Sequence, residues 1–173
     1  GSAECLVTDV FRGLIRCQTG VSSGRVSSVE FTNEITVNVP RNRFIELFDD
    51  PENLKLWQKG LLSFDAVSGT PGEPGATSRL LYKQGRGTME MVETVTRRKL
   101  PDAFDGTYDA KGVHNVCKNE FHDVDGISTR WVAHNTFEFS GFMKIVGLLF
   151  GSMFPKQNLK TMNEFKSFAE AQA

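Results

Sequence analysis

Three asparagines are the residues whose type and position most clearly suggest chemistry in this sequence. Asn115, Asn119 and Asn135 fall on the apolar side of segments that alternate between apolar and polar residues. A buried amide needs hydrogen-bond partners, because its transfer out of water is otherwise costly. The three amides therefore bond one another, the backbone and water, or they orient a ligand in a mostly apolar site.

A carboxyl and a phenol are predicted to lie on the same apolar side. Strand alternation places Glu93 and Tyr82 there, on two neighbouring strands. Such groups can act as general acid and base, so Glu93 and Tyr82 are weak candidates for catalysis. The alternative for Glu93 is a solvated carboxylate near an open strand end.

Other chemistries find little support. By alternation, Cys117 lies on the face of the sheet opposite to His114, His122 and His134, which argues against a cysteine–histidine nucleophile. No HExxH or CxxC motif is present, and we therefore expect neither a metal site nor a cofactor.

Charge and composition narrow the class of protein. The 173 residues include 20 basic and 21 acidic side chains, a net charge of −1, which predicts no nucleic-acid partner. Three cysteines form no disulfide framework and favour a reducing, cytoplasmic location. No apolar run reaches the ~20 residues of a transmembrane helix. We expect a soluble protein, and a homodimer is compatible with the sequence.

Alternation and turn residues predict the elements that must position these side chains. Strands are expected over residues 29–39, 61–69, 79–83, 88–96, 103–109, 113–123 and 127–139. Short helices are expected over 41–49 and after the Asp50-Pro51 pair, where Asp50 serves as the N-cap. The result is an α+β fold with seven antiparallel strands in meander order and a long helix at the end.

The first hairpin has a clear register. If residues 84–87 form its loop, Tyr82 pairs with Met89 and Leu80 with Met91. This register keeps apolar and polar side chains on separate faces, and it places Glu93 beside Ser78.

The second hairpin allows two loops. A two-residue turn at Asp125-Gly126 would pair Trp131 with Glu120, whereas a three-residue loop over 124–126 pairs Asn119 with Trp131 and Glu120 with Arg130. We favour the three-residue loop, because it gives an apolar inner face and a favourable cross-strand charge pair.

The closing stretch, residues 141–173, has apolar residues three and four apart, which predicts a helix. Pro155 lacks an N–H group, and the helix must therefore kink or break there. Met162, Phe165 and Ala169 in the second half are expected to be core. Val146, Phe150 and Met153 in the first half are expected at the mouth of a cavity.

The chain divides into an N-terminal extension, residues 1–28, and one domain, residues 29–173. Gly1-Ser2 resembles a remnant of expression. Residues 3–17 read as an amphipathic helix, followed by a segment of linker composition over 19–28. The extension is either a targeting or anchoring helix, or a variable extension that docks on the surface.

Several segments have the pattern of one superfamily. They are residues 39–48, Trp57, residues 75–77, the strand around Met91 and Glu93, residues 126–131, and the closing segments 141–144, 154–157 and 165–170. In these segments and in its order of elements the chain resembles the START-like or SRPBCC superfamily, which includes polyketide cyclases, lipid-transfer proteins and the birch-pollen allergen group. The resemblance covers roughly residues 29–171. It implies a helix-grip fold, in which a curved antiparallel sheet wraps around a long helix and a hydrophobic cavity lies between the sheet and the helix.

The resemblance leads to a binding hypothesis. We expect the cavity to hold a small hydrophobic molecule, such as a lipid or polyketide, for binding and transport. The expected lining residues are Trp57, Tyr82, Met89, Met91, Phe104, Tyr108, Asn115, Cys117, Asn119, Trp131, Asn135, Val146, Phe150 and Met153.

Two alternatives remain open. The chain could be a cyclase or dehydratase in which Glu93 and Tyr82 act on a polyketide-like or aromatic substrate. It could also be an interaction module with a collapsed cavity. A filled interior, with no pocket as large as roughly 300 Å³, would favour that alternative.

Overall fold

A computed structural model describes residues 28–173 of the chain. The helix predicted over residues 3–17, the linker after it, and Cys5 and Cys17 lie outside the described residues. Within residues 28–173, no helix has the length and apolar character needed to cross a bilayer.

Seven antiparallel strands form one sheet in the order β1-β7-β6-β5-β4-β3-β2. The strands are β1 (Ser28–Val37), β2 (Leu61–Ser68), β3 (Thr77–Gln84), β4 (Gly87–Lys99), β5 (Ala103–Ala110), β6 (Val113–Asp123) and β7 (Thr129–Phe139). The helices are α2 (Arg41–Asp49), η1 (Pro51–Asn53), α3 (Leu54–Trp57), α4 (Met143–Phe150) and α5 (Met153–Glu170). The predicted α+β fold with a meander sheet is confirmed.

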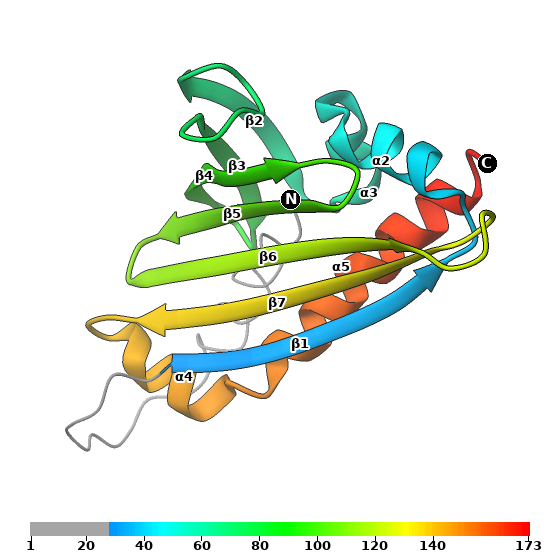
Figure 1. Cartoon of the computed structure of the whole chain (residues 1–173). Helices are drawn as coiled ribbons and strands as arrows, with labels where there is room; N and C mark the ends of the chain where they lie inside the picture. Colours follow the sequence, from blue (N-terminus) through cyan, green and yellow to red (C-terminus); the bar gives the residue numbers. More distant parts are fainter. Residues whose placement is uncertain (1–27) are drawn as a thin grey trace.

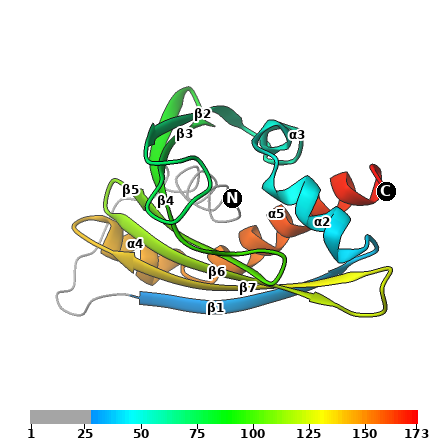
Figure 2. The same cartoon turned by 45° about the horizontal axis from the view of Figure 1, so that its top comes forward.

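The sheet is curved, and α5 lies on its concave side (Figure 1). Figure 2 shows that β2, β3 and β4 curl up from the floor made by β5, β6, β7 and β1, and that α2 and α3 span the open side. Each strand turns one face toward α5, and the apolar residues of the sequence alternation occupy that face.

The segment between β1 and β2 follows its local signals. Pro40 precedes α2, which begins at Arg41 as predicted and buries Phe44, Leu47 and Phe48. The Asp50 carboxylate then accepts a hydrogen bond from the Glu52 N–H at 2.9 Å and caps η1. This is the N-cap that the Asp50-Pro51 pair predicts.

The first hairpin has the predicted register. Tyr82 lies opposite Met89, Leu80 opposite Met91 and Ser78 opposite Glu93. The loop is tighter than expected, because Gln84 and Gly87 pair with each other and leave a two-residue turn. Gly85 has a φ of +57° there, which the turn requires.

The predicted register of the second hairpin is wrong by two residues. Trp131 lies opposite Phe121, and Asn119 lies opposite Ala133. The loop spans five residues, 124–128, because the Asp125 carboxylate accepts hydrogen bonds from the backbone N–H groups of Ile127 and Ser128 and from the Ser128 hydroxyl. A slip of two residues leaves every side chain on its predicted face.

Two smaller consequences follow from this loop. The hydrogen bond from the Ser128 side chain, together with the backbone hydrogen bond from Ile127, lowers the pKa of Asp125 from its usual value. The predicted pair of Glu120 with Arg130 does not form, since the register separates them. Arg130 instead donates to Glu34 of β1 at 3.1 Å.

The closing helix is divided in two, as predicted. The break lies at Gly151-Ser152, and Pro155 occupies the first turn of α5, where a missing N–H costs no helical hydrogen bond. Gly147 lets α4 approach β7, because a Cβ atom there would lie 2.4 Å from the Phe139 ring.

The larger apolar core gathers around Phe165 of α5. Its ring centroid lies 4.8 Å from that of Phe44, 5.1 Å from Trp57 and 5.6 Å from Trp131. Met162, Phe165 and Ala169 are all fully buried, which confirms the prediction that the second half of the closing helix is core. A smaller cluster lies under α4. It contains Val113, Phe137, Phe139, Met143, Val146 and Phe154.

Phe165→Ala is expected to lower the free energy of unfolding by about 3–5 kcal/mol, because it opens a cavity where rings from two helices and the sheet meet. Urea unfolding followed by circular dichroism measures the change. The matched variant Phe142→Ala removes an exposed ring and should change stability by no more than about 0.5 kcal/mol. Similar losses in the two variants would contradict this account of the core.

Candidate ligand pocket

A row of polar side chains crosses the concave face of the sheet. Ser78 of β3 lies opposite Glu93 of β4, Glu93 opposite Tyr108 of β5, and Tyr108 opposite Asn115 of β6. All four residues are buried. A hydroxyl, a carboxyl, a phenol and an amide therefore lie side by side in an otherwise apolar interior.

Tyr108 and Glu93 are joined directly. The Tyr108 hydroxyl donates a hydrogen bond to Glu93 Oε1 at 2.7 Å. Gly106 lies beside this phenol, where a Cβ atom would be in ordinary contact with the Tyr108 hydroxyl at 3.6 Å but tightly placed against the Thr94 carbonyl oxygen at 3.2 Å.

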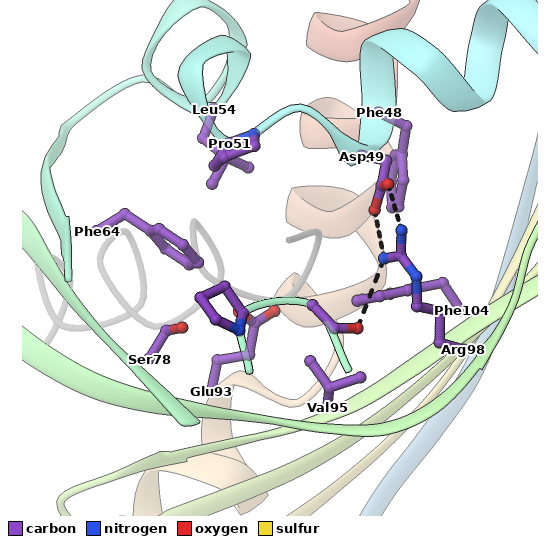
Figure 3. Close-up of a pocket in the computed structure, with 12 residues that line it drawn as sticks. Phe48, Asp49, Pro51, Leu54, Phe64, Ser78, Glu93, Val95, Arg98 and Phe104 are labelled. Atoms are coloured by element: carbon purple, nitrogen blue, oxygen red, sulfur yellow. Dashed lines mark hydrogen bonds and ion pairs between the residues drawn. The ribbon is translucent and has the colours of Figure 1, made fainter. Parts of the chain in front are cut away.

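One end of this row opens into a pocket of about 200 Å³. Ser78, Glu93 and Val95 rise from the sheet to form its base, and Leu54 and Pro51 lie across from them (Figure 3). The remaining lining residues are Phe48, Asp49, Phe64, Pro71, Gly72, Arg98 and Phe104. The pocket is thus apolar on its walls and polar at its base and at one side.

Arg98 closes that side. Its Nη1 donates to Asp49 Oδ1 at 2.7 Å, and its Nη2 donates to Asp49 Oδ2 (Figure 3). Nη1 also lies 3.5 Å from the Gly72 carbonyl oxygen, and Nε lies 3.9 Å from Glu73 Oε1. The guanidinium therefore ties the end of α2 and the loop between β2 and β3 to β4.

The hydrogen bond that Arg98 donates to the Asp49 side chain raises the pKa of Arg98, and the charges of Asp49 and Glu73 act in the same direction against the effect of burial. Arg98 therefore stays charged throughout the physiological pH range.

A β-bulge brings Arg98 to the pocket. The register between β4 and β5 shifts by one residue between Val95 and Arg97, so that Val95 lies opposite Gly106 but Arg98 lies opposite Phe104. The bulge reverses the alternation, and Arg98 joins the inner face while Arg97 points outward to Asp105.

Of the three amides, Asn119 is fully used by the fold. Its Oδ1 accepts from Trp131 Nε1 at 2.9 Å, and its Nδ2 donates to the Phe104 carbonyl oxygen at 3.0 Å and to Cys117 Sγ at 3.4 Å. This side chain fixes Trp131 and joins β5 to β6 and β7.

Asn115 and Asn135 each have one amide atom without a hydrogen-bond partner among the described residues. Asn115 Nδ2 donates to Asn135 Oδ1 at 3.3 Å, but Asn115 Oδ1 and Asn135 Nδ2 are buried with no partner among the described residues. One acceptor and one donor are therefore unsatisfied side by side, which is unusual for buried polar groups.

The expected lining residues are spread over the interior. Phe104 lines the pocket of about 200 Å³, together with the candidate Glu93. Eight of the expected residues belong to the larger core cluster. They are Trp57, Tyr82, Met89, Met91, Phe104, Tyr108, Cys117 and Trp131. Val146 is buried in the smaller cluster under α4, Phe150 packs against that cluster, and Met153 is exposed, so none of the three lines the pocket of about 200 Å³.

Trp57 also lines an open groove of about 600 Å³ between α3 and α5, with Leu56, Lys160, Glu164 and Phe168 among its neighbours. Its Nε1 atom is buried and has no partner among the described residues.

Glu93 and Tyr82 are not neighbours in the structure. Tyr82 is four residues from Ser78 along β3, about 13 Å at ~3.3 Å per residue, and its hydroxyl donates to Gln58 Oε1. Tyr108 takes the place beside Glu93. The sequence offered a signal for this, because alternation places Tyr108 on the inner face.

The outer face of the sheet carries the histidines. His114 Nδ1 lies 2.7 Å from Asp109, His122 Nε2 lies 3.2 Å from Glu120, and His134 Nδ1 lies 2.8 Å from Thr32. In the described part of the chain, no three His, Cys, Asp or Glu side chains are grouped for metal binding.

Several pocket residues were missed by sequence reasoning. Phe48, Asp49, Pro51 and Leu54 come from the α2–η1–α3 segment, and Phe64 comes from β2. No local signal in the sequence shows that a pocket borders Phe48 or Leu54.

Comparison with known proteins supports the fold. No protein-family model and no curated protein sequence matches the chain. Solved structures do match it. The ZhuI aromatase/cyclase from Streptomyces sp. R1128 has a TM-score of 0.70 at 11% identity, covering 83% of this chain and 94% of that one. Ara h 8.0201 has a TM-score of 0.68 at 15% identity, covering 83% and 99%.

A third neighbour is norcoclaurine synthase from Thalictrum flavum, in complex with dopamine and hydroxybenzaldehyde. Its TM-score is 0.65 at 10% identity, covering 91% of this chain and 99% of that one. These neighbours have the START-like or SRPBCC fold, and the predicted resemblance is confirmed at the level of fold.

Asn119→Ala is expected to lower the free energy of unfolding by at least about 2 kcal/mol, because it leaves Trp131 Nε1 and the Phe104 carbonyl oxygen buried without partners. Urea unfolding measures the loss. Asn163→Ala, which removes an exposed asparagine of α5, is the matched control and should have an effect within about 0.5 kcal/mol. An Asn119→Ala variant with the same free energy of unfolding as the wild type would show that this amide does not support the sheet.

Proposed function

We propose that this chain, which has the helix-grip fold of the SRPBCC superfamily, binds a small hydrophobic molecule between its sheet and its helices. The observation that carries the proposal is the pocket of about 200 Å³ with apolar walls and the buried Ser78 and Glu93 at its base. Apolar contact would supply the affinity, at roughly 25 cal/mol per Å² before ordering costs.

The volume of the pocket limits the ligand. An apolar cavity of about 150 Å³ is large enough for benzene. A pocket of about 200 Å³ therefore accommodates one ring or a short acyl segment, or the end of a longer molecule that leaves through the mouth.

The polar groups limit the chemistry of the ligand. Glu93 and Ser78 at the base favour a ligand whose buried end carries a hydroxyl or amine that can donate a hydrogen bond. Aromatic walls from Phe48, Phe64 and Phe104 favour a planar ring. A phenol or a ring-containing polyketide fits both requirements.

Val95→Phe fills the pocket from its base and is expected to weaken binding of an apolar fluorescent dye about tenfold or more, because the ring competes for the same space. Fluorescence titration measures the dissociation constant. Val67→Phe, the same substitution at an exposed position of β2, is the control and should leave it unchanged. Native mass spectrometry of protein purified from cells should detect a bound small molecule in the wild type and less of it in Val95→Phe.

Equal dye affinity in the two variants would count against this pocket as the binding site. The absence of both dye binding and a co-purified molecule would count against small-molecule binding altogether.

A cyclase or dehydratase is the second candidate function, and the hydrogen bond between Tyr108 and Glu93 favours it. A phenol joined to a carboxyl at the base of a pocket can shuttle a proton to a bound carbonyl compound. In this proposal Tyr108 takes the role expected of Tyr82, and its hydrogen bond to Glu93 supports that choice.

Glu93→Gln is expected to abolish any turnover without loss of dye binding, since it removes the proton acceptor and preserves the shape of the side chain. Product formation from a mixture of dopamine and hydroxybenzaldehyde, the two molecules in the norcoclaurine synthase complex, is a first assay. Glu90→Gln, on the exposed face of the same strand, is the matched control. Equal rates in wild type and Glu93→Gln would argue against a catalytic Glu93.

An interaction module remains the third candidate. The described pocket is smaller than the roughly 300 Å³ at which ligand sites usually begin, which favours this reading. The dye titration distinguishes it, because a module with a collapsed cavity would bind no dye in this pocket and Val95→Phe would leave the dye affinity unchanged.

A further inference from the structure

An exposed apolar face lies on and beside α4. Phe142 is 68% exposed, Leu148 75%, Leu149 61% and Met153 39%. The four residues, which we call the α4 face, fall within twelve positions of the sequence. Singly exposed apolar residues need no explanation, whereas several large ones exposed on one short helix and the start of the next are typical of an interaction site.

The opposite side of α4 already packs on the sheet. Met143, Val146 and Gly147 are buried there against β7 and its surroundings. The α4 face is therefore not misplaced core. A helix that is apolar on all sides is expected to be covered on all sides, and here only one side is covered by the described residues.

The charges carried by α4 and by the first half of α5 have one sign, between Glu138 of β7 and Glu164 of α5. Residues 139–163 contain Lys144, Lys156 and Lys160 and no aspartate or glutamate, whereas the whole chain has nearly equal numbers of acidic and basic residues. Lys144 and Lys156 are exposed. The exposed apolar residues of α4 thus belong to a stretch of sequence whose charged side chains are all lysines.

The α4 face also lies at one end of the molecule. Figure 1 shows α4 at the end of the sheet opposite to the β6–β7 loop and the C terminus. A short helix at a corner of the protein can touch a flat surface without obstruction from α2, α3 or the β6–β7 loop.

We propose that the α4 face docks on an anionic lipid bilayer. Helix α4 lies in the interface, Phe142, Leu148 and Leu149 enter the boundary between headgroups and acyl chains, and the lysines contact lipid phosphates. Short apolar helices with lysines at their edges bind membranes in this way, through buried apolar area and attraction to anionic lipids.

The same charges argue against a second copy of the chain as the occupant. A two-fold dimer through the α4 face would bring this lysine-rich stretch against itself, and like charges across an interface oppose association. An anionic surface is the complementary partner.

The experiment is vesicle flotation of the full chain with phosphatidylcholine alone and with phosphatidylcholine mixed with phosphatidylglycerol. Binding is expected only with the anionic mixture, and added salt should weaken it. Leu148→Asp should reduce the binding constant about tenfold or more, and Lys156→Ala about fivefold, the equivalent of ~1 kcal/mol per surface lysine.

Ile127→Asp is the matched control, because Ile127 is 69% exposed but lies in the β6–β7 loop at the other end of the molecule. It should bind vesicles as the wild type does. Circular dichroism checks that both Asp variants are folded.

Three results would overturn the proposal. The first is no binding to anionic vesicles, and the second is equal loss in Leu148→Asp and Ile127→Asp. The third is a concentration-dependent dimer that Leu148→Asp dissolves, seen by light scattering, which would assign the α4 face to a second copy.

Discussion

The packing of the Phe165 ring is the interaction on which the rest of the structure depends. The ring contacts Phe44 of α2, Trp57 of α3 and Trp131 of β7, so that one side chain of α5 joins the short helices to the sheet. A sheet with one apolar face must be covered, and α5 is the only described helix long enough to cross it. With α5 in this position, α2 and α3 are held over the open side, where they border the pocket.

The alternation of the strands gives the interior its chemistry. Because antiparallel neighbours face one another, inner positions on four successive strands place Ser78, Glu93, Tyr108 and Asn115 in one row. The polar groups of the interior differ in how many of their hydrogen-bonding atoms already have partners in the fold. Asn119 is used entirely in holding Trp131, whereas Asn115 Oδ1 in the row lacks a partner among the described residues.

Apolar surface is divided between two ends of the protein. The pocket lies where α2, α3 and the strands β2 to β5 meet, and the α4 face lies at the far end of the sheet. A small hydrophobic ligand and a lipid surface would therefore be contacted by separate parts of the chain. Arg98 holds parts of the pocket together, because its guanidinium donates to Asp49 of α2 and to the Gly72 carbonyl oxygen of the loop between β2 and β3.

Local chemistry in the sequence determined the elements and their faces. Pro40 and Asp50-Pro51 set the limits of α2 and η1, and the division of the closing helix follows from Gly151 and Pro155. The faces of β6 and β7 were predicted correctly although their register was wrong, because a slip of two residues conserves alternation. Glu93 and the inner amides could be found for the same reason.

Tertiary structure alone decided what the pocket contains. The bulge between Val95 and Arg97 turns Arg98 inward, and it depends on how β4 meets β5 rather than on any turn residue. Phe48 and Leu54 border a pocket only because α5 holds their segment above the sheet. Alternation and capping act between near neighbours and can be read from the chain, whereas the space between distant segments depends on how all of them pack at once.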